Sequence, residues 1–329
     1  MAEKGILCQE IVRYKGEPAA FDVVRVNDQS FFVDGKFLRT AGLRKDKDEW
    51  QQDVDKPEQI VQALKSCSKR IDLMRFWQRI PESEPRFPYY REWRDIAAIP
   101  ITTFKHWWEK QVAPSVRNKI RKAQKFGVTC GEVQFDENFL RGVMEIYRQS
   151  PVRRGKAFWH YNRSIESVRA GLTADLNEAI LIGAYHEDNL LGFIKLLLAD
   201  RYAMIVLILD KLAERNKAPM NSMIAKAVEV CADRRIPYIT YTTWRRGEQG
   251  KFQESNGFVK IRVPEYFVPL TIRGRLALAL GLHKGLKGAL PEQLLVWLIE
   301  LRRRWYALKF RPVAEVGHSK TDAAAASSN

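Results

Sequence analysis

The chain has 329 residues, of which 46% are hydrophobic and 29% charged, a composition typical of a globular protein that excludes an intrinsically disordered one. Its formal net charge is +16, with +8 in residues 113–272 and +6 in residues 273–329. This excess favours a nucleotide-bearing donor, RNA or an anionic membrane face as partner, although a generally basic, soluble surface would give the same charge.

Several site classes receive no support from the sequence. The cysteines Cys8, Cys67, Cys130 and Cys231 are far apart, so they predict neither a zinc knuckle nor a disulfide framework. The histidines form no His-Glu-x-x-His motif, and we expect no metal. Because the chain starts without a basic leader and has no 18-residue apolar run, we expect a cytoplasmic protein.

The first third of the chain predicts a small α/β lobe. Residues 21–43 alternate loosely around the turn signal Val33-Asp34-Gly35-Lys36, which indicates a hairpin. A helix is expected over residues 56–68 and a strand over Ile71–Trp77. Residues 80–114 are rich in proline and aromatic residues, which is typical of a connector whose tryptophans fill the seam between two lobes.

A second lobe is predicted to follow. The basic helix from Ser115 to Gly127 could follow a phosphodiester backbone or an acidic lipid surface, or it could be a solvated face. A strand over Val128–Phe135 and an amphipathic helix over Asn138–Arg148 come next.

The loop over residues 149–161 combines cations, a glycine and aromatic rings. Guanidinium groups bind phosphate and rings stack on sugar faces, so this loop is our candidate for acceptor recognition, although it could also be an exposed basic loop that its aromatics anchor. The residues are Arg153, Arg154, Lys156, Trp159 and Tyr161, with His160 between the two aromatics.

The central stretch of this lobe predicts a parallel strand pair. After a hairpin over residues 178–199, Ala203–Leu209 reads as a strand buried on both faces, and an amphipathic helix begins at Pro219. The strand Pro237–Thr243 follows the helix, so the two strands are expected to be parallel, with a site at their carboxyl ends. After Asn256-Gly257-Phe258, two more strands, 259–263 and 266–270, would complete a sheet of about seven strands.

This order, ending in Gly257-Phe258, resembles the core of the GNAT acyltransferase superfamily. The basic segment 117–123, followed by 125–128, is similar to the opening of the second lobe in FemAB-like proteins. The resemblance covers about residues 113–271. It implies an α/β (α+β) mixed sheet of the GNAT-like acyl-CoA N-acyltransferase fold. A degenerate, smaller GNAT-like lobe would occupy residues 1–112 and a catalytic lobe residues 113–272. A basic amphipathic helical segment over 273–310 and a disordered tail over 311–329 would follow.

The resemblance also implies a site and a reaction. An acceptor amine would attack a donor thioester whose carbonyl is polarised by a backbone N–H near Val206, Leu207 and Ile208. Asp210 or His160 would be the base, and Tyr241 would protonate the leaving sulfur. The donor would bind at the start of the helix. The residues there are Arg215, Asn216, Lys217, Ala218 and Asn221.

Two features depart from the family pattern, the pyrophosphate loop and one later position. The pyrophosphate loop of the family has glycine at the position of Ala218, and glycine or alanine at the position of Met220. The larger side chains here weaken the case for standard coenzyme A binding. Gln253 replaces a tyrosine that often serves as the general acid. FemAB-like proteins that use aminoacyl-tRNA also lack the glycine loop.

Residues 273–310 alternate leucines with eight basic and two acidic residues. This pattern fits an amphipathic helical anchor on an anionic membrane surface, or a helical cap over the catalytic lobe.

Three functions remain open. The first is an enzyme that moves an acyl group from acyl-CoA to an amine such as an amino sugar, in cell-surface polysaccharide or cell-wall biosynthesis, as a cytoplasmic protein that is peripheral on the inner membrane face. The second is a FemAB-like aminoacyl-tRNA-dependent transferase. The third is a non-catalytic binding protein on a degenerate fold.

Overall fold

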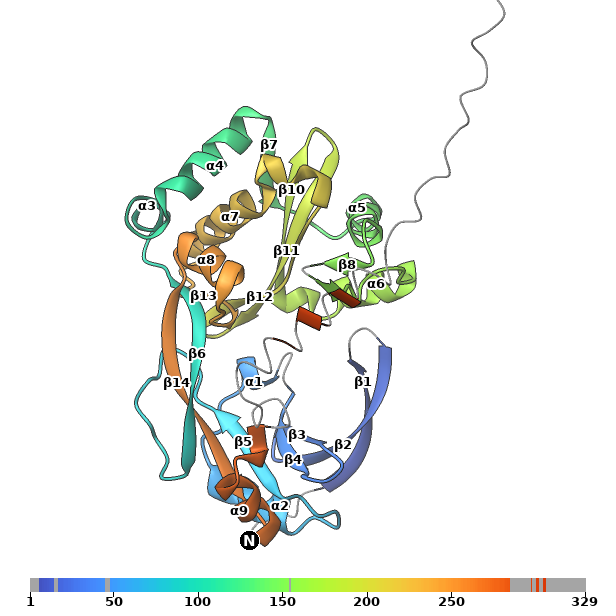
Figure 1. Ribbon diagram of the computed structural model, residues 1–329, viewed down its shortest axis with the longest axis vertical. Helices are drawn as coiled ribbons and strands as arrows, with labels where there is room; N and C mark the ends of the chain where they lie inside the picture. Colours follow the sequence, from blue (N-terminus) through green and yellow to red (C-terminus); the bar gives the residue numbers. More distant parts are fainter. Residues whose placement is uncertain are drawn as a thin grey trace, which may run out of the picture.

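A computed structural model describes residues 6–14, 17–44, 48–153 and 155–284, together with residues 297, 300, 301, 304 and 305. Its main feature is one mixed sheet of twelve strands in the order β1-β2-β3-β4-β5-β14-β6-β13-β12-β11-β10-β7 (Figure 1). The strands are β1 Ile6–Tyr14, β2 Glu17–Val26, β3 Gln29–Asp34, β4 Thr40–Leu43, β5 Leu73–Trp77, β6 Tyr90–Pro100, β7 Val128–Glu132, β10 Ala179–His186, β11 Asn189–Ala199, β12 Tyr202–Asp210, β13 Tyr238–Thr243 and β14 Val259–Pro269.

The two halves of the sheet repeat one topology. In the first half, the antiparallel meander β2-β3-β4 leads through helix α2 (Pro57–Lys65) to β5, which pairs with β4 in parallel. In the second half, β10-β11-β12 leads through helix α7 (Pro219–Asp233) to β13, which pairs with β12 in parallel. The topology therefore supplies the internal repeat that the sequence does not display.

Two long strands exchange partners between the halves. β6, from the first half of the chain, pairs with β13, and β14, from the end of the second, pairs with β5; the two also pair with each other. The connector expected over residues 80–114 thus contains a sheet strand of eleven residues. The two strands expected over 259–270 are one, because Pro264 lies within β14 and its carbonyl accepts a hydrogen bond from Gln78 N–H at 3.0 Å.

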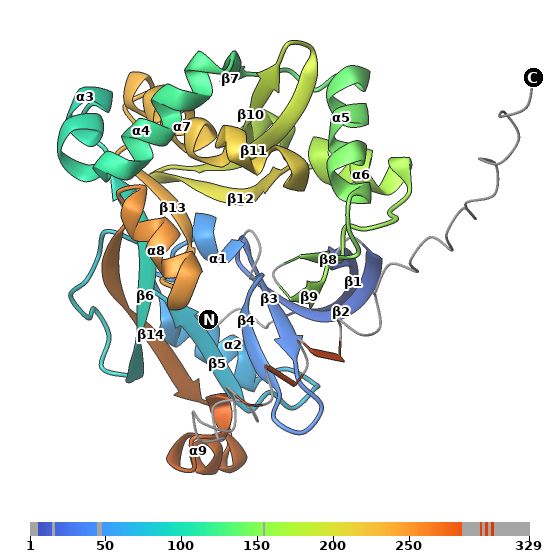
Figure 2. The same ribbon diagram turned by 45° about the horizontal axis from the view of Figure 1, so that its top comes forward.

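Helices cover both faces of the second half (Figure 2). On one face, α4 (Pro114–Lys125) and α7 pack through Val116, Ile120, Met223 and Ala227 into a shared apolar core. On the other face, α5 (Glu137–Arg148) and α6 (Ile165–Thr173) form a separate core with Phe193. The remaining helical segments are α1 Asp48–Gln51, α3 Phe104–His106, a π-helical turn Trp107–Gln111, η2 Leu176–Glu178, η3 Leu212–Lys217, α8 Gly247–Ser255, α9 Ile272–Ala279 and η4 Leu282–Lys284.

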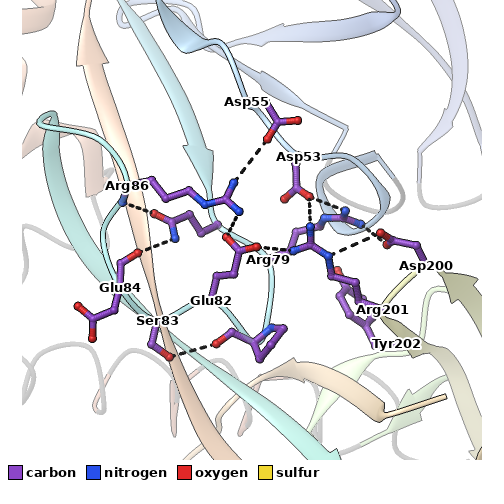
Figure 3. Close-up of polar contacts among 12 residues, drawn as sticks. Asp53, Asp55, Arg79, Glu82, Ser83, Glu84, Arg86, Asp200, Arg201 and Tyr202 are labelled. Atoms are coloured by element: carbon purple, nitrogen blue, oxygen red, sulfur yellow. Dashed lines mark hydrogen bonds and ion pairs between the residues drawn. The ribbon is translucent and has the colours of Figure 1, made fainter. Parts of the chain in front are cut away.

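A buried charged cluster joins the two halves (Figure 3). Arg79, only 3% exposed, donates to Asp53 Oδ2 at 2.7 Å and to Asp200 Oδ1 at 3.0 Å, and Arg201 also reaches Asp53 at 3.0 Å. Burial alone would raise the pKa of Asp53, but the hydrogen bond and charge of Arg79 lower it. Trp50 lies beside this cluster, at 4.8 Å between ring centroids from Trp77. The seam is therefore filled by these residues, whereas Trp107 of the connector lies in the core beside α4 and α7.

Candidate active site

The parallel strands β12 and β13 separate after a short contact. Only Ala203 with Ile239 and Met204 with Thr240 are paired, although β12 continues to Asp210 and β13 to Thr243. Val206, Leu207 and Tyr241 beside the gap are half-buried. The ladder is therefore open between the carboxyl ends of the two strands, which is the position at which ligands bind in open α/β sheets.

A bulge in β12 places one residue of this opening outside the regular pairing. Leu196 pairs with Ile205 and Lys195 with Leu207, so Val206 has no partner on β11. A β-bulge re-aims the backbone of its residue and is common next to active sites. The stretch Val206–Ile208, expected to polarise a carbonyl, thus contains an irregular backbone segment at the required place.

Gln253 is hydrogen-bonded to the backbone at the end of β13. Its side chain is fully buried, accepts a hydrogen bond from Arg245 N–H at 2.9 Å and donates to the carbonyl of Tyr241 at 3.1 Å. Because both partners are backbone groups at the end of β13, the amide fixes the path of that strand. The residue that replaces the family's tyrosine therefore has a structural role, which its spacing in the sequence did not reveal.

The loop before α7 places a non-glycine residue in the left-handed conformation. Ala218 has φ 50° and ψ 43°, a left-handed conformation that glycine adopts most easily, and Pro219 is the first helical residue. No side chain caps α7, so the N–H groups of its first turn are left without a side-chain partner at the start of the helix. Asn221 donates to Asn256 Oδ1 at 3.0 Å, which joins this turn to the Gly257-Phe258 segment.

Asp210, a candidate base, is already engaged by two arginines. Its carboxylate is 3.2 Å from Arg215 Nε and 3.9 Å from Arg153 Nη1, and its side chain is only 5% exposed. Arg153 is also buried and donates to the backbone carbonyls of Asp210 and Ile146, both at 2.9 Å. Arg153 thus ties the candidate acceptor loop to the end of β12.

The other candidate base, His160, is buried among aromatic rings. It is 6% exposed, and its ring centroid lies 4.3 Å from that of Tyr147 and 5.1 Å from that of Phe158. Burial, with the nearby charges of Arg163 and Arg153, lowers the pKa of His160 to about 3. Its imidazole is therefore neutral at pH 7 and a weak proton acceptor.

The remaining candidates of the acceptor loop lie further out. Lys156 is exposed, Trp159 is 49% exposed with the Arg163 guanidinium 5.0 Å from its ring, and Tyr161 is half-buried. Arg154 lies outside the described residues. Tyr241 packs against Phe258 in the second half of the sheet.

Two hollows flank this region. One, of about 420 Å³, lies between the end of α5 and η3 and is lined by Arg148, Gln149, Asn189 and Lys211 among others. The other, of about 340 Å³, lies between α4 and α7, where Ser222 and Lys226 face Arg121. Among the described residues, no three His, Cys, Asp or Glu side chains gather closely enough to hold a metal ion.

Solved structures share this architecture. The C-terminal domain of a putative lysylphosphatidylglycerol synthetase from Agrobacterium fabrum superposes with a TM-score of 0.52 and 11% identity over 79% of this chain and 87% of that one. FemX superposes with a TM-score of 0.51 and 10% sequence identity, over 84% of this chain and 90% of FemX. L-PGS from Bacillus licheniformis superposes with a TM-score of 0.50 and 13% sequence identity, over 75% of this chain and 83% of that one. The chain has the FemAB-like GNAT fold. No protein-family profile and no curated protein sequence matches it.

The GNAT fold accounts for the arrangement of the site. The matches extend over most of the chain, so they include the first half of the sheet as well as residues 113–271. The expected mixed sheet with a smaller GNAT-like lobe is confirmed. In the described part of the chain, no helix is both long and apolar enough to cross a membrane.

Proposed function

We propose that this protein is an N-acyltransferase that moves an acyl group from acyl-CoA to an amine such as an amino sugar, in cell-surface polysaccharide or cell-wall biosynthesis. The observation that carries the proposal is the separation of β12 and β13 beyond Met204 and Thr240, with the uncapped start of α7 beside it. Similarity of fold to solved structures such as FemX supports a transferase.

In this reaction, the amine nitrogen forms a bond to the thioester carbon, the carbon–sulfur bond breaks and the thiolate takes up a proton. The backbone N–H of Val206, or of Leu207 or Ile208, would donate to the oxyanion that develops on the carbonyl. Lys156, Trp159 and Tyr161 would contact the acceptor, and Arg153 would hold their loop in place. Asp210, His160 and Tyr241 remain the candidates for proton transfer.

The oxyanion role has a direct test. The Val206→Pro variant removes one N–H from the bulge, where no ladder pairing is lost, and Val206→Ala is the matched control that keeps the N–H. Loss of one such donor costs on the order of a hundredfold in kcat. Equal activity of the two variants would remove Val206 N–H from the mechanism.

The alternative donor is an aminoacyl-tRNA, as in some FemAB-like proteins. The exposed cations of α4 favour it, and a similar fold occurs in a protein named as a putative lysylphosphatidylglycerol synthetase. Titration calorimetry with acetyl-CoA and with charged tRNA separates the two donors. Binding of neither would favour the third reading, a non-catalytic binding protein.

We also propose that residues 273–310 bring the protein to an anionic membrane surface, peripherally on the cytoplasmic face. Helix α9 buries its small residues Gly274 and Ala277 and exposes Ile272 (75%) and Leu276 (59%); Leu280, directly after the helix, is 70% exposed. Arg273 donates to the carbonyl of Phe37, whose ring is 86% exposed in the neighbouring hairpin. Apolar side chains next to cations fit an anionic bilayer. Residues 285–296 and most of 298–310 lie outside the described residues.

A flotation assay with vesicles that contain 30–40 mol% phosphatidylglycerol, roughly the anionic surface that attracts basic segments, tests this proposal. The Leu276→Asp, Leu280→Asp variant is expected to lose vesicle binding. Ile6→Asp, Ile11→Asp is the matched control, because these residues are equally exposed on β1. Unchanged binding of the α9 variant would reject the membrane contact.

A further inference from the structure

The groove between α4 and α7 has the features of a binding site, and the proposed reaction gives its lining residues no role. Its volume of about 340 Å³ is at the lower end of the range of small-molecule pockets. Ile120, Arg121 and Gln124 of α4 form one wall, and Ser222, Lys226 and Glu229 of α7 form the other. Val128 and Cys130 of β7 and the rings of Phe104 and Trp108 complete the lining.

An aromatic surface and a cation meet in this groove. The rings of Phe104 and Trp108 are stacked, with centroids 6.0 Å apart and an interplanar angle of 26°. The Arg121 guanidinium lies 5.6 Å from the Trp108 ring, and Trp108 is half-buried. A planar base could stack on such a ring while the guanidinium binds an adjacent phosphate.

The outer face of α4 extends this positive charge. Lys119, Arg121, Lys122 and Lys125 are exposed, and α4 contains no acidic residue. Within the described part of the chain, no carboxylate forms an ion pair with these cations. Phe126, 48% exposed, follows them with Lys122 Nζ 5.4 Å from its ring. Glu229 brings one negative charge to the groove, but Lys226 Nζ pairs with it at 2.8 Å.

The groove runs between α4 and α7 and reaches β7 at the edge of the sheet. α4 packs against η3 and α7, and α3 also contacts α7; α4 and α7 lie side by side in both views (Figures 1 and 2). Ser222 is one turn into α7, next to the loop that contains Ala218. A ligand in the groove can therefore extend towards the carboxyl end of β12.

We propose that this groove binds an adenosine phosphate, with the adenine on Trp108 and the phosphates on Arg121 and the exposed lysines of α4. Two donors carry that group: coenzyme A, and the 3′ end of tRNA, where the adenosine is part of a single strand. Only the identification of the ligand as the donor rests on the proposed function, because binding is measured without turnover. Aromatic rings interleaved with cations are the usual surface for single-stranded nucleic acid, so the chemistry suits both sources.

The test measures binding of two probes by the full-length protein. Coenzyme A is titrated by calorimetry, and a labelled single-stranded RNA that ends in cytidine-cytidine-adenosine is titrated by fluorescence anisotropy. The variants are Arg121→Ser and Trp108→Leu in the groove, and Lys122→Glu, Lys125→Glu on the outer face of α4. The control, Lys56→Glu, Lys65→Glu, makes the same charge change at exposed residues near or on α2.

For at least one probe, Arg121→Ser and Trp108→Leu are expected to weaken binding about tenfold. If RNA is the ligand, Lys122→Glu, Lys125→Glu also weakens RNA binding, and the slope of log K against log salt becomes shallower by about 1.4, since each phosphate contact on a single strand contributes about 0.7. If coenzyme A is the ligand, this lysine variant leaves its affinity within about twofold of that of the control.

The proposal is overturned if Arg121→Ser binds both probes as tightly as the control, or if neither probe binds the wild-type protein. Arg121 is exposed, so this variant is expected to fold even if Trp108→Leu does not. Failure of the transferase proposal is a separate result, because Val206→Pro lies outside the groove. A protein that binds adenosine phosphate here but transfers no acyl group would retain this inference and refute the proposed function.

Discussion

The burial of His160 predicts a specific dependence of stability on pH. The unfolded chain binds a proton at His160 with a pKa near 6.5, whereas burial lowers the native pKa to about 3. The unfolded state therefore binds more protons between these values, so stability falls as pH falls through 6.5. From pH 7 to pH 5, this one group lowers the free energy of unfolding by about 2 kcal/mol.

The perturbation is His160→Phe, which keeps an aromatic ring among Tyr147 and Phe158 and removes the titration. Urea unfolding of both proteins at pH 7 and pH 5 gives two changes in the free energy of unfolding. The wild type is expected to lose about 2 kcal/mol more than the variant, because all other groups titrate in both. An equal loss would mean that the native imidazole takes up a proton, and the argument from burial would then fail.

Three further predictions concern backbone and seam contacts. Gln253→Leu leaves the N–H of Arg245 and the carbonyl of Tyr241 without this side-chain partner, so it should lower the free energy of unfolding by about 2–4 kcal/mol in urea titrations. A loss under about 1 kcal/mol, the value of one ordinary hydrogen bond, would contradict the role given to this amide. Ala218→Gly should raise stability by about 0.5–1 kcal/mol, since it relieves the left-handed conformation at some cost in unfolded-state entropy; a lower Tm would argue against that strain. Arg79→Met should cost about 3–5 kcal/mol at pH 7. Because Arg79 lowers the pKa of Asp53, part of that difference should disappear in acid, as pH falls through the lowered native pKa; a pH-independent difference would refute the pairing.

The parts of the fold that could be predicted are those whose residues carry a strong periodic pattern. The uniformly apolar strand before Pro219 and the helix after it gave the parallel pair, beside which the candidate site was placed. β6 was missed because the first half of the strand is polar and partly exposed, and prolines flank it. Its partner β14 is more than 150 residues away, so the pairing leaves no local signal in the sequence. Pairing between distant segments decides such strands, not propensity.

The site shows the same limit. Ala218 and Gln253 could be identified as departures from the family pattern, but their roles depend on a backbone angle and on two carbonyl and amide partners that only the folded chain defines. Arg153 was expected to face a ligand because arginine beside glycine often binds phosphate; its guanidinium instead bonds the carbonyls of Asp210 and Ile146. Trp108 and Arg121 are thirteen positions apart in the sequence, and only helix packing brings them together.

The exchange of β6 and β14 also bears on how the protein can assemble during synthesis. Strand β5, complete at Trp77, must wait for residues 259–269 before its second edge is covered. Chains emerge from the ribosome at about 5–20 residues per second, so that edge stays open for about ten seconds or longer. An uncovered strand edge recruits foreign strands, so the nascent amino-terminal half should depend on chaperones until the final strand arrives.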